Sequence, residues 1–175
     1  MRNILRTMTD DELEAQADLF GKVFVLAQHL TRRTDAALEH LGLTSRQWLL
    51  LAVLTRGFPG HAPSLTEAAE RYGSSRQNVK QVALGLAARG YLRLVPDPLD
   101  GRTTRLELTG KVRLFDTPDS VARTRTLFED VFAGLSEDDV ATLRRLLVRW
   151  LDELMTDRGP VARGPDTKEE NDDVR

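Results

Sequence analysis

The side chains with the clearest binding chemistry lie close together near the middle of the chain. Between positions 74 and 81 the sequence has hydroxyl, amide and cationic side chains: Ser74, Ser75, Arg76, Gln77, Asn78, Lys80 and Gln81. Amides can bind adenine with two hydrogen bonds, hydroxyls adapt to several base edges, and cations bind phosphate. The segment therefore favours contact with a DNA duplex through its major groove. A merely solvated helix face is the alternative that this segment alone leaves open.

An amphipathic helix over about residues 75–89 would position these side chains. Its buried face is predicted by four apolar residues at three- and four-residue spacing: Val79, Val82, Ala83 and Leu86. Because successive residues turn by about 100°, Gln77 and Gln81 lie roughly opposite that face. A shorter helix begins near Ser64 and a tight turn joins the two, so this part of the chain is predicted to form a helix-turn-helix.

A β-hairpin is predicted after this helix. Tyr91–Val95 and Thr103–Leu108 alternate apolar and charged side chains, and a turn rich in Pro, Asp and Gly separates them. Arg102 lies near the tip, where a guanidinium could enter a narrow minor groove, and Arg105 in the second strand is a further candidate DNA contact. Asp100 is expected to orient Arg102 or to bind a backbone amide of the turn.

Charge is segregated along the chain. The whole sequence has a formal net charge of −2, whereas residues 64–109 contain seven basic and five acidic residues, a balance of +2 that leaves −4 for the remainder. From Arg71 to Pro96 there are five basic residues and no acidic one. A local positive surface on a helix-turn-helix is typical of a module that binds a nucleic-acid duplex.

Further helices are predicted on both sides of this region. Ser or Thr followed three residues later by Glu, Gln or Asp marks a helix start, and the pattern occurs at Thr9/Glu12, Thr44/Gln47, Ser64/Glu67, Ser74/Gln77 and Ser136/Asp139. We expect four further helices, over about residues 10–41, 45–56, 118–133 and 137–156. The run Trp48–Leu54 is apolar nearly all round, so its helix should be the most buried. Residues 111–115 could begin a helix or extend the second strand.

Residues 44–109 resemble the winged helix-turn-helix of MarR-type transcriptional regulators. The resemblance rests on the helix end Leu86-Ala-Ala-Arg-Gly-Tyr-Leu92 and on the turn Pro96-Asp-Pro-Leu-Asp-Gly-Arg102, which leads to Leu106-Glu-Leu-Thr109. The family usually has Asp-Arg-Arg at the wing, and here Asp100-Gly101-Arg102 lacks the first Arg, which weakens one backbone contact. Pro118 also interrupts the long helix into which the family's wing usually runs.

This resemblance implies a homodimer joined through its N- and C-terminal helices, with two recognition helices in successive major grooves of a pseudo-palindromic operator. Apolar side chains suited to dimerisation lie on the first and last helices: Phe20, Phe24, Leu147, Trp150, Leu151 and Leu154. Such a stripe would be a liability on a monomer. Packing of these helices within one chain is the alternative.

The resemblance also implies a small-molecule effector between the dimer helices and the DNA-binding lobe. His29, Arg33 and Trp48 are candidates to line a cleft between the first two helices, together with Arg32 and His40. Each histidine could equally be a surface residue. The three histidines show no metal-ligand spacing and the chain has no Cys, so we expect no metal site, no cofactor and no thiol-based sensing.

These observations predict a mainly α fold with a small β-hairpin wing. Its expected parts are an N-terminal dimerisation arm at 1–43, a winged helix-turn-helix lobe at 44–110, C-terminal dimerisation helices at 111–156 and a disordered tail at 157–175. No run of about 18 apolar residues predicts a membrane span, and the first residues lack the apolar core of a signal peptide, so a cytoplasmic protein is expected.

The predicted function is sequence-specific DNA binding by a homodimeric transcription regulator. We expect this regulator to be a repressor whose repression is relieved by a small molecule. A winged-helix module that binds proteins instead of DNA is the alternative. An enzyme is not expected, because the sequence has no phosphate-binding Gly loop, no nucleophile–base signature and no defensible carboxylate pair.

Overall fold

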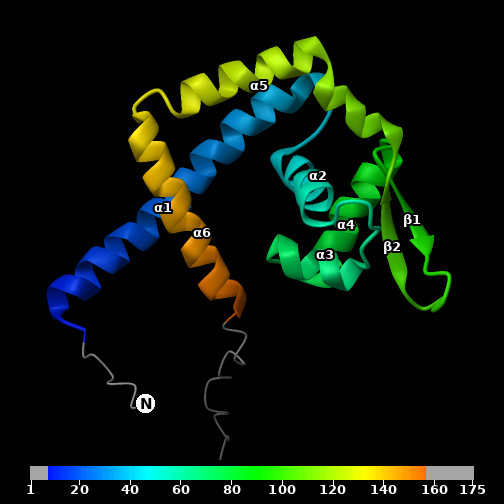
Figure 1. Cartoon of the computed structure of the whole chain (residues 1–175), viewed down its shortest axis with the longest axis horizontal. Coiled ribbons are helices and arrows are strands. Elements are labelled where there is room, and N and C mark those ends of the chain that lie inside the picture. Colours follow the sequence, from blue (N-terminus) through cyan, green and yellow to red (C-terminus); the bar gives the residue numbers. More distant parts are fainter. Residues whose placement is uncertain (1–7, 157–175) are drawn as a thin grey trace, which may run out of the picture. The chain divides into compact units, whose positions relative to one another are not determined.

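The computed structural model describes residues 8–156 as a series of helices with one β-hairpin (Figure 1). The elements are α1 (Asp10–Leu38), η1 (Glu39–Leu41), α2 (Ser45–Gly57), α3 (Leu65–Tyr72), α4 (Arg76–Ala88), β1 (Leu92–Pro96), β2 (Thr104–Leu108), η2 (Gly110–Asp116), α5 (Pro118–Val131) and α6 (Glu137–Thr156). The chain divides into two compact units between Val131 and Phe132, and α6 belongs to the second. The predicted fold class is confirmed; the tail predicted to be disordered lies outside the described residues.

Capping boxes begin three of the helices where they were predicted. Thr9, Thr44 and Ser64 each accept a hydrogen bond from the amide three residues later, and the Glu or Gln at that position binds the cap amide in return. Ser136 and Asp139 make the same reciprocal pair before α6, at 3.0 and 3.2 Å. Local hydrogen bonding therefore sets these helix starts, which is why the sequence pattern locates them.

The predicted capping pair Ser74/Gln77 is wrong by one residue. Ser75 is the cap of α4, and its hydroxyl accepts from the Asn78 amide at 3.2 Å. Gly73 ends α3 with φ +72°, a left-handed conformation that favours glycine. The chain thus needs Ser74 for the turn itself, and α4 begins one residue later than the sequence pattern suggests.

The core lies under α2, α3, α4 and the hairpin. Its completely or almost completely buried apolar side chains are Leu50, Leu54, Leu65, Ala68, Val79, Ala83, Leu86, Leu92 and Leu106. They recur at helical spacing on the helices and at alternate positions on the strands. Helix α2, which was expected to be the most buried, has four buried residues, the largest number in any described helix, although its Leu49 is 44% exposed.

The hairpin is a two-stranded antiparallel sheet that lies beside α3 and α4 (Figure 1). Leu92 pairs with Leu108 and Leu94 with Leu106, so one face of the hairpin is apolar and packs on the core. Residues 110–116, which the sequence left between helix and strand, form the 3₁₀ helix η2. The hairpin therefore ends at Leu108, and the chain enters α5 through Thr117 and Pro118 as predicted.

Helices α1 and α6 bury little of their apolar surface. Of the described residues in α1 only Leu38 is buried, and α6 has no buried residue. Large apolar side chains on both are instead between one third and two thirds exposed. Within residues 8–156 no helix combines the length and the apolar character that crossing a membrane requires.

Candidate nucleic-acid interface

The exposed face of α4 carries the side chains that the sequence singles out for DNA contact. Val79, Ala83 and Leu86 are fully buried on the opposite face, which sets the rotation of the helix. The remaining candidates on this helix and its cap are exposed: Ser75, Arg76, Gln77, Asn78, Lys80 and Gln81. The sequence therefore places this polar face correctly, because the buried apolar residues dictate which way it points.

The start of α4 is held in place by its own polar side chains. The Ser75 hydroxyl accepts from the Asn78 amide, and the Asn78 side-chain amide donates to the Ser74 hydroxyl at 2.8 Å. Ser74 is only partly exposed. Ser74 and Ser75 thus shape the turn between α3 and α4, which aims the first turn of α4 and its exposed amides outwards.

Asp100 shapes the wing turn through backbone contacts. Its carboxylate accepts from the Arg102 amide at 3.0 Å and from the Thr103 hydroxyl at 2.9 Å. The Thr103 amide also donates to the Asp100 carbonyl at 2.9 Å. Of the two roles expected for Asp100, the structure has the one in which it binds the turn backbone. The Arg102 residue itself is exposed at the tip of the wing.

Arg105 does not lie on the exposed side of the wing in the way its strand position suggests. Its Nε donates to the Asp97 carboxylate, and its Nη1 donates to the Ala62 carbonyl at 2.8 Å. Nη1 also lies 3.9 Å from the Glu67 carboxylate, and the side chain is only 28% exposed. The Arg105 guanidinium is therefore paired with groups of the lobe itself, whereas Arg102 and the candidate side chains on α4 are exposed.

Asp97 is a buried polar residue that the sequence analysis did not select. Its carboxylate accepts from the Leu99 and Asp100 amides at 2.7 and 3.1 Å and from Arg105. The Leu99 amide and then the Arg105 guanidinium hold the pKa of Asp97 below its ordinary value, because both stabilise the carboxylate form. An Asp before Pro at the start of a turn could have indicated this role, since Asp commonly binds the backbone two residues later.

The three candidate ligand-pocket residues do not share a site. His29 Nδ1 lies 3.2 Å from Arg32 and lines a shallow hollow on α1, whereas Arg33 forms an ion pair with Asp130 of α5. Trp48 lies at a different place, in a small pocket of about 30 Å³ between α1, α2, η2 and α5. The sequence analysis expected them to line one cleft between the first two helices, whereas His29 lines a hollow formed by α1 residues alone and neither His29 nor Arg33 lines the Trp48 pocket.

The Trp48 pocket has three large aromatic side chains, Trp48, Phe115 and Phe128, among its twelve lining residues. Phe115 and Phe128 face it together with His40, whose Nε2 lies 3.4 Å from the buried Ser120 hydroxyl. Tyr91, at the base of the wing, packs against Phe115 with ring centroids 6.2 Å apart. The pocket therefore lies next to Tyr91, the residue that directly precedes β1.

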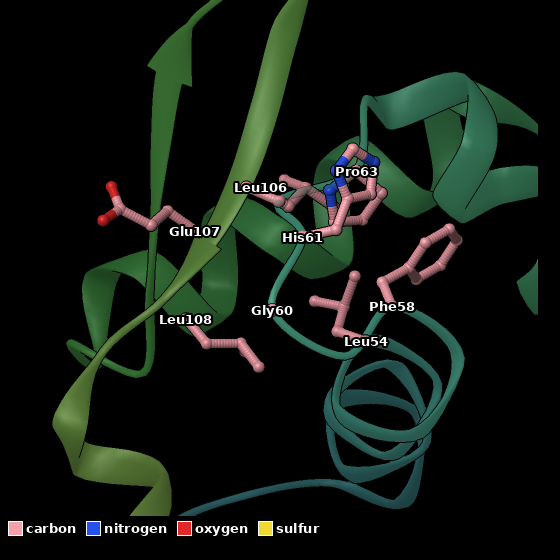
Figure 2. A pocket seen from close by; sticks show the side chains of 9 residues that line it. Leu54, Phe58, Gly60, His61, Pro63, Leu106, Glu107 and Leu108 are labelled. Atoms are coloured by element: carbon pink, nitrogen blue, oxygen red, sulfur yellow. The ribbon is translucent and has the colours of Figure 1, made fainter.

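A second hollow, of about 380 Å³, lies between the end of α2, the loop before α3, and β2 (Figure 2). Leu54, Phe58, Leu106 and Leu108 give it mostly apolar walls, and in Figure 2 the Glu107 carboxylate points away from them. His61, whose Nε2 lies 3.7 Å from the Glu67 carboxylate, also lines this hollow.

The apolar candidates for dimerisation are exposed on the helices that carry them. Phe20 and Phe24 form an edge-to-face pair with ring centroids 4.9 Å apart and are 60% and 59% exposed. On α6 the candidates are also open to solvent: Leu147, Trp150, Leu151 and Leu154. Both helices thus present apolar side chains that the single chain does not cover.

Comparison with proteins of known sequence points to one family. Residues 41–103 match the family model described as MarR family. The transcriptional activatory protein BadR of Rhodopseudomonas palustris is 26% identical over 153 residues, which cover 85% of this chain and 87% of BadR. The HTH-type transcriptional repressor IacR of Pseudomonas putida is 26% identical over 117 residues, which cover 67% of this chain and 68% of IacR.

The fold is also shared with solved structures. A mutant of the E. coli protein MarR, crystallised in complex with operator DNA, superposes with a TM-score of 0.62 over 77% of this chain and 94% of that one, at 19% identity. At this identity the likeness establishes the fold alone. The winged helix-turn-helix built from α2, α3, α4 and the hairpin is thus a fold that in another protein occurs bound to DNA.

Proposed function

The chain belongs to the MarR family of transcription regulators, and on that premise we propose that it binds a pseudo-palindromic operator as a homodimer through α4 and the wing. The observation that carries the proposal is the exposed polar face of α4 opposite Val79, Ala83 and Leu86. A helix with amides, hydroxyls and cations on its solvent side matches the edges presented in a major groove. Arg102 at the wing tip supplies a cation for the adjacent minor groove.

We propose that a second copy of the chain covers the apolar faces of α1 and α6. In this division residues 1–43 and 111–156 are dimerisation arms and residues 44–110 are the DNA-binding lobe. The support is the exposure of Phe20, Phe24 and the apolar residues of α6 in the single chain. Two lobes held by one dimer would contact two half-sites about one helical turn apart.

We propose repression relieved by a small molecule as the mode of regulation. IacR is named a repressor and BadR an activatory protein, and the proposal follows the repressor. The Trp48 pocket is the site that we propose for the effector, because Phe115 in its lining packs against Tyr91 at the base of the wing. With a volume of about 30 Å³ it must widen to admit a ligand, and such widening would move η2 and α5.

The test is direct binding to a DNA site that the protein itself selects from random-sequence duplexes. We expect Gln77→Ala and Gln81→Ala to reduce discrimination at particular bases by roughly 1–3 kcal/mol, and Arg102→Ala to weaken binding to most sequences. Arg56→Ala on α2 is the matched control for Arg102→Ala, since Arg56 is exposed and lies outside α4, the wing and the proposed dimerisation arms.

Two results would contradict this assignment. If no duplex is bound even at low salt while the protein stays folded, the winged helix serves protein binding instead of DNA binding. If a duplex is bound and all three variants leave its footprint unchanged, the DNA contacts lie elsewhere. Transcription in vitro from a promoter carrying the selected site then decides between repression and activation.

A further inference from the structure

We propose that Asp97, Arg105, Glu67 and the Ala62 carbonyl form a clasp that positions the wing, and that Arg105 affects DNA binding through Arg102 without touching DNA. We call these four groups the wing clasp. The inference rests on the proposed function, because it assigns roles within the same DNA interface. It replaces the expectation that Arg105 is itself a DNA contact.

Asp97 fixes the turn that carries Arg102. Its carboxylate is almost completely buried and holds the amides of Leu99 and Asp100, so the first half of the turn cannot move without breaking these bonds. The Asp97 amide in turn donates to the Thr103 carbonyl at 2.8 Å. Asp97 therefore closes the wing turn from one side, and Asp100 closes it from the other. Arg102 projects from the backbone between them.

Arg105 links this turn to the helix-turn-helix. Its guanidinium binds Asp97 on one side and the Ala62 carbonyl on the other, with Glu67 at 3.9 Å. Two of its nitrogens are thus already donating within the molecule, and the side chain is 28% exposed. The Asp97 and Glu67 carboxylates compensate the positive charge of the guanidinium, so its remaining N–H donors attract a phosphate less strongly than those of the exposed Arg102.

The other end of the clasp is rigid because α3 begins there. Glu67 makes a capping box with Ser64, with hydrogen bonds of 2.7 and 3.2 Å. Ser64 forms a β-bridge with Arg105, and the Leu106 amide donates to the Pro63 carbonyl at 2.8 Å. The Ser64 amide and hydroxyl lower the pKa of Glu67, as do His61 at 3.7 Å and Arg105, so its carboxylate stays charged. These contacts fix the position of β2, and with it the wing, relative to the start of α3.

Asp97→Asn separates this role from simple electrostatics. Removing a negative charge from a DNA-facing lobe should strengthen binding if charge alone matters. If the clasp positions Arg102, the same substitution should weaken operator binding by about tenfold, the equivalent of one charge-assisted hydrogen bond. Glu107→Gln is the matched control, because this substitution removes the same charge from β2. Glu107 pairs with Arg93 across the hairpin, outside the clasp. Its affinity should stay the same or rise.

Arg105→Lys tests how the residue acts. Lysine keeps the charge and would keep a phosphate contact, but it cannot bind Asp97 and Ala62 with the same fixed fork. We expect operator affinity to fall about tenfold in the wild-type background and less than about threefold when Arg102 is already alanine, because coupled residues are not additive. Equal losses in both backgrounds, or no loss at all, would overturn the proposal, as would tighter binding by Asp97→Asn.

A readout without DNA separates this inference from the proposed function. In Asp97→Asn the amides of Leu99 and Asp100 should exchange with solvent at least about tenfold faster, while amides in the α4 core keep their protection. If the wild-type protein binds no duplex, the proposed function fails although the amide exchange still reports the clasp. If the duplex is bound and these amides exchange at the wild-type rate, the clasp is wrong. Thermal melting of each variant verifies that the lobe is folded.

Discussion

The winged helix-turn-helix buries most of its large apolar side chains, whereas the helices α1 and α6 leave theirs exposed. In the lobe, Leu50, Val79, Leu86 and Leu106 are at most 1% exposed, and the exposed residues of α4 are polar except for Leu84 and Ala88. In α1 and α6 the apolar side chains are exposed, Phe20 by 60% and Leu154 by 62%. The lobe completes its core within one chain, whereas the two helices need something to cover them.

The magnitudes explain why this difference matters. Fully burying a Leu or Phe side chain contributes about 1.5–3 kcal/mol, so the six candidate side chains on α1 and α6 represent a large unrealised stabilisation. Monomeric proteins seldom leave such surfaces open. The lobe therefore completes its core in a single chain, whereas the operator recognition that we propose depends on a second copy covering α1 and α6.

The largest expected effect is loss of the partner. Leu151→Asp puts a charge in the proposed interface, so the protein should sediment as a monomer, and affinity for a two-half-site operator should fall about a thousandfold because the second half-site no longer binds in the same complex. Thr142→Asp is the matched control, since it lies nine residues earlier on α6 and, at about 100° per residue, half a turn away. Equal sedimentation of the two variants, both dimeric, would contradict the division between lobe and arms.

The next effect tests the lobe core. Leu86 is fully buried in α4, and Leu86→Ala should lower the free energy of unfolding by about 3 kcal/mol through the lost transfer energy and the remaining cavity. Leu84→Ala removes the same atoms from the same helix, but Leu84 is 44% exposed, so its cost should be well under half as large. Urea unfolding of both variants measures the difference, and similar losses would mean that the core does not lie under this face.

Local patterns predicted much of this lobe from the sequence. The capping boxes at Thr9, Thr44 and Ser64 involve residues three apart, and the buried face of α4 follows from helical spacing, so both can be read without knowing the fold. The prediction of Ser74 as the α4 cap was wrong because two adjacent serines compete. Only the observed left-handed conformation at Gly73 and the backbone around it decide between them.

Contacts between distant segments were not predictable in the same way. Strand alternation placed Arg105 on the solvent side, but the Ala62 carbonyl comes from a loop 43 residues earlier, and no local pattern announces that bond. His29, Arg33 and Trp48 were expected to line one cleft between the first two helices, but α5 and η2 also pack there, so that Arg33 pairs with Asp130 and Trp48 lines a pocket with Phe115 and Phe128. The polar face of α4 could be predicted from the sequence because it follows from local spacing, whereas the contacts of Arg105 with distant segments could not.

A smaller effect resolves the two serines before α4. Ser75→Ala removes the cap hydrogen bond to the Asn78 amide and should lower the free energy of unfolding by about 1 kcal/mol. Ser74→Ala removes only the acceptor of the Asn78 side chain, which is exposed, so its cost should be about half a kcal/mol or less. Denaturant titrations of the two variants give the comparison, and a larger loss for Ser74→Ala would return the cap to the position that the sequence pattern indicated.

The smallest expected effect is a pH dependence of the lobe's stability that arises from Asp97. Backbone amides and Arg105 lower the pKa of Asp97 from its ordinary value of 3.8, so the folded state holds the charged form more strongly than the unfolded chain does. The resulting stabilisation is fully present above about pH 5 and is lost as the pH falls towards the lowered pKa. Asp97→Asn cannot titrate, so the difference in unfolding midpoint between wild type and variant should be constant from about pH 5 to 7 and shrink below about pH 4. A difference that instead grows on acidification would mean that Asp97 is not held as a carboxylate. The charged pair between Asp97 and Arg105 would then not be what positions the wing.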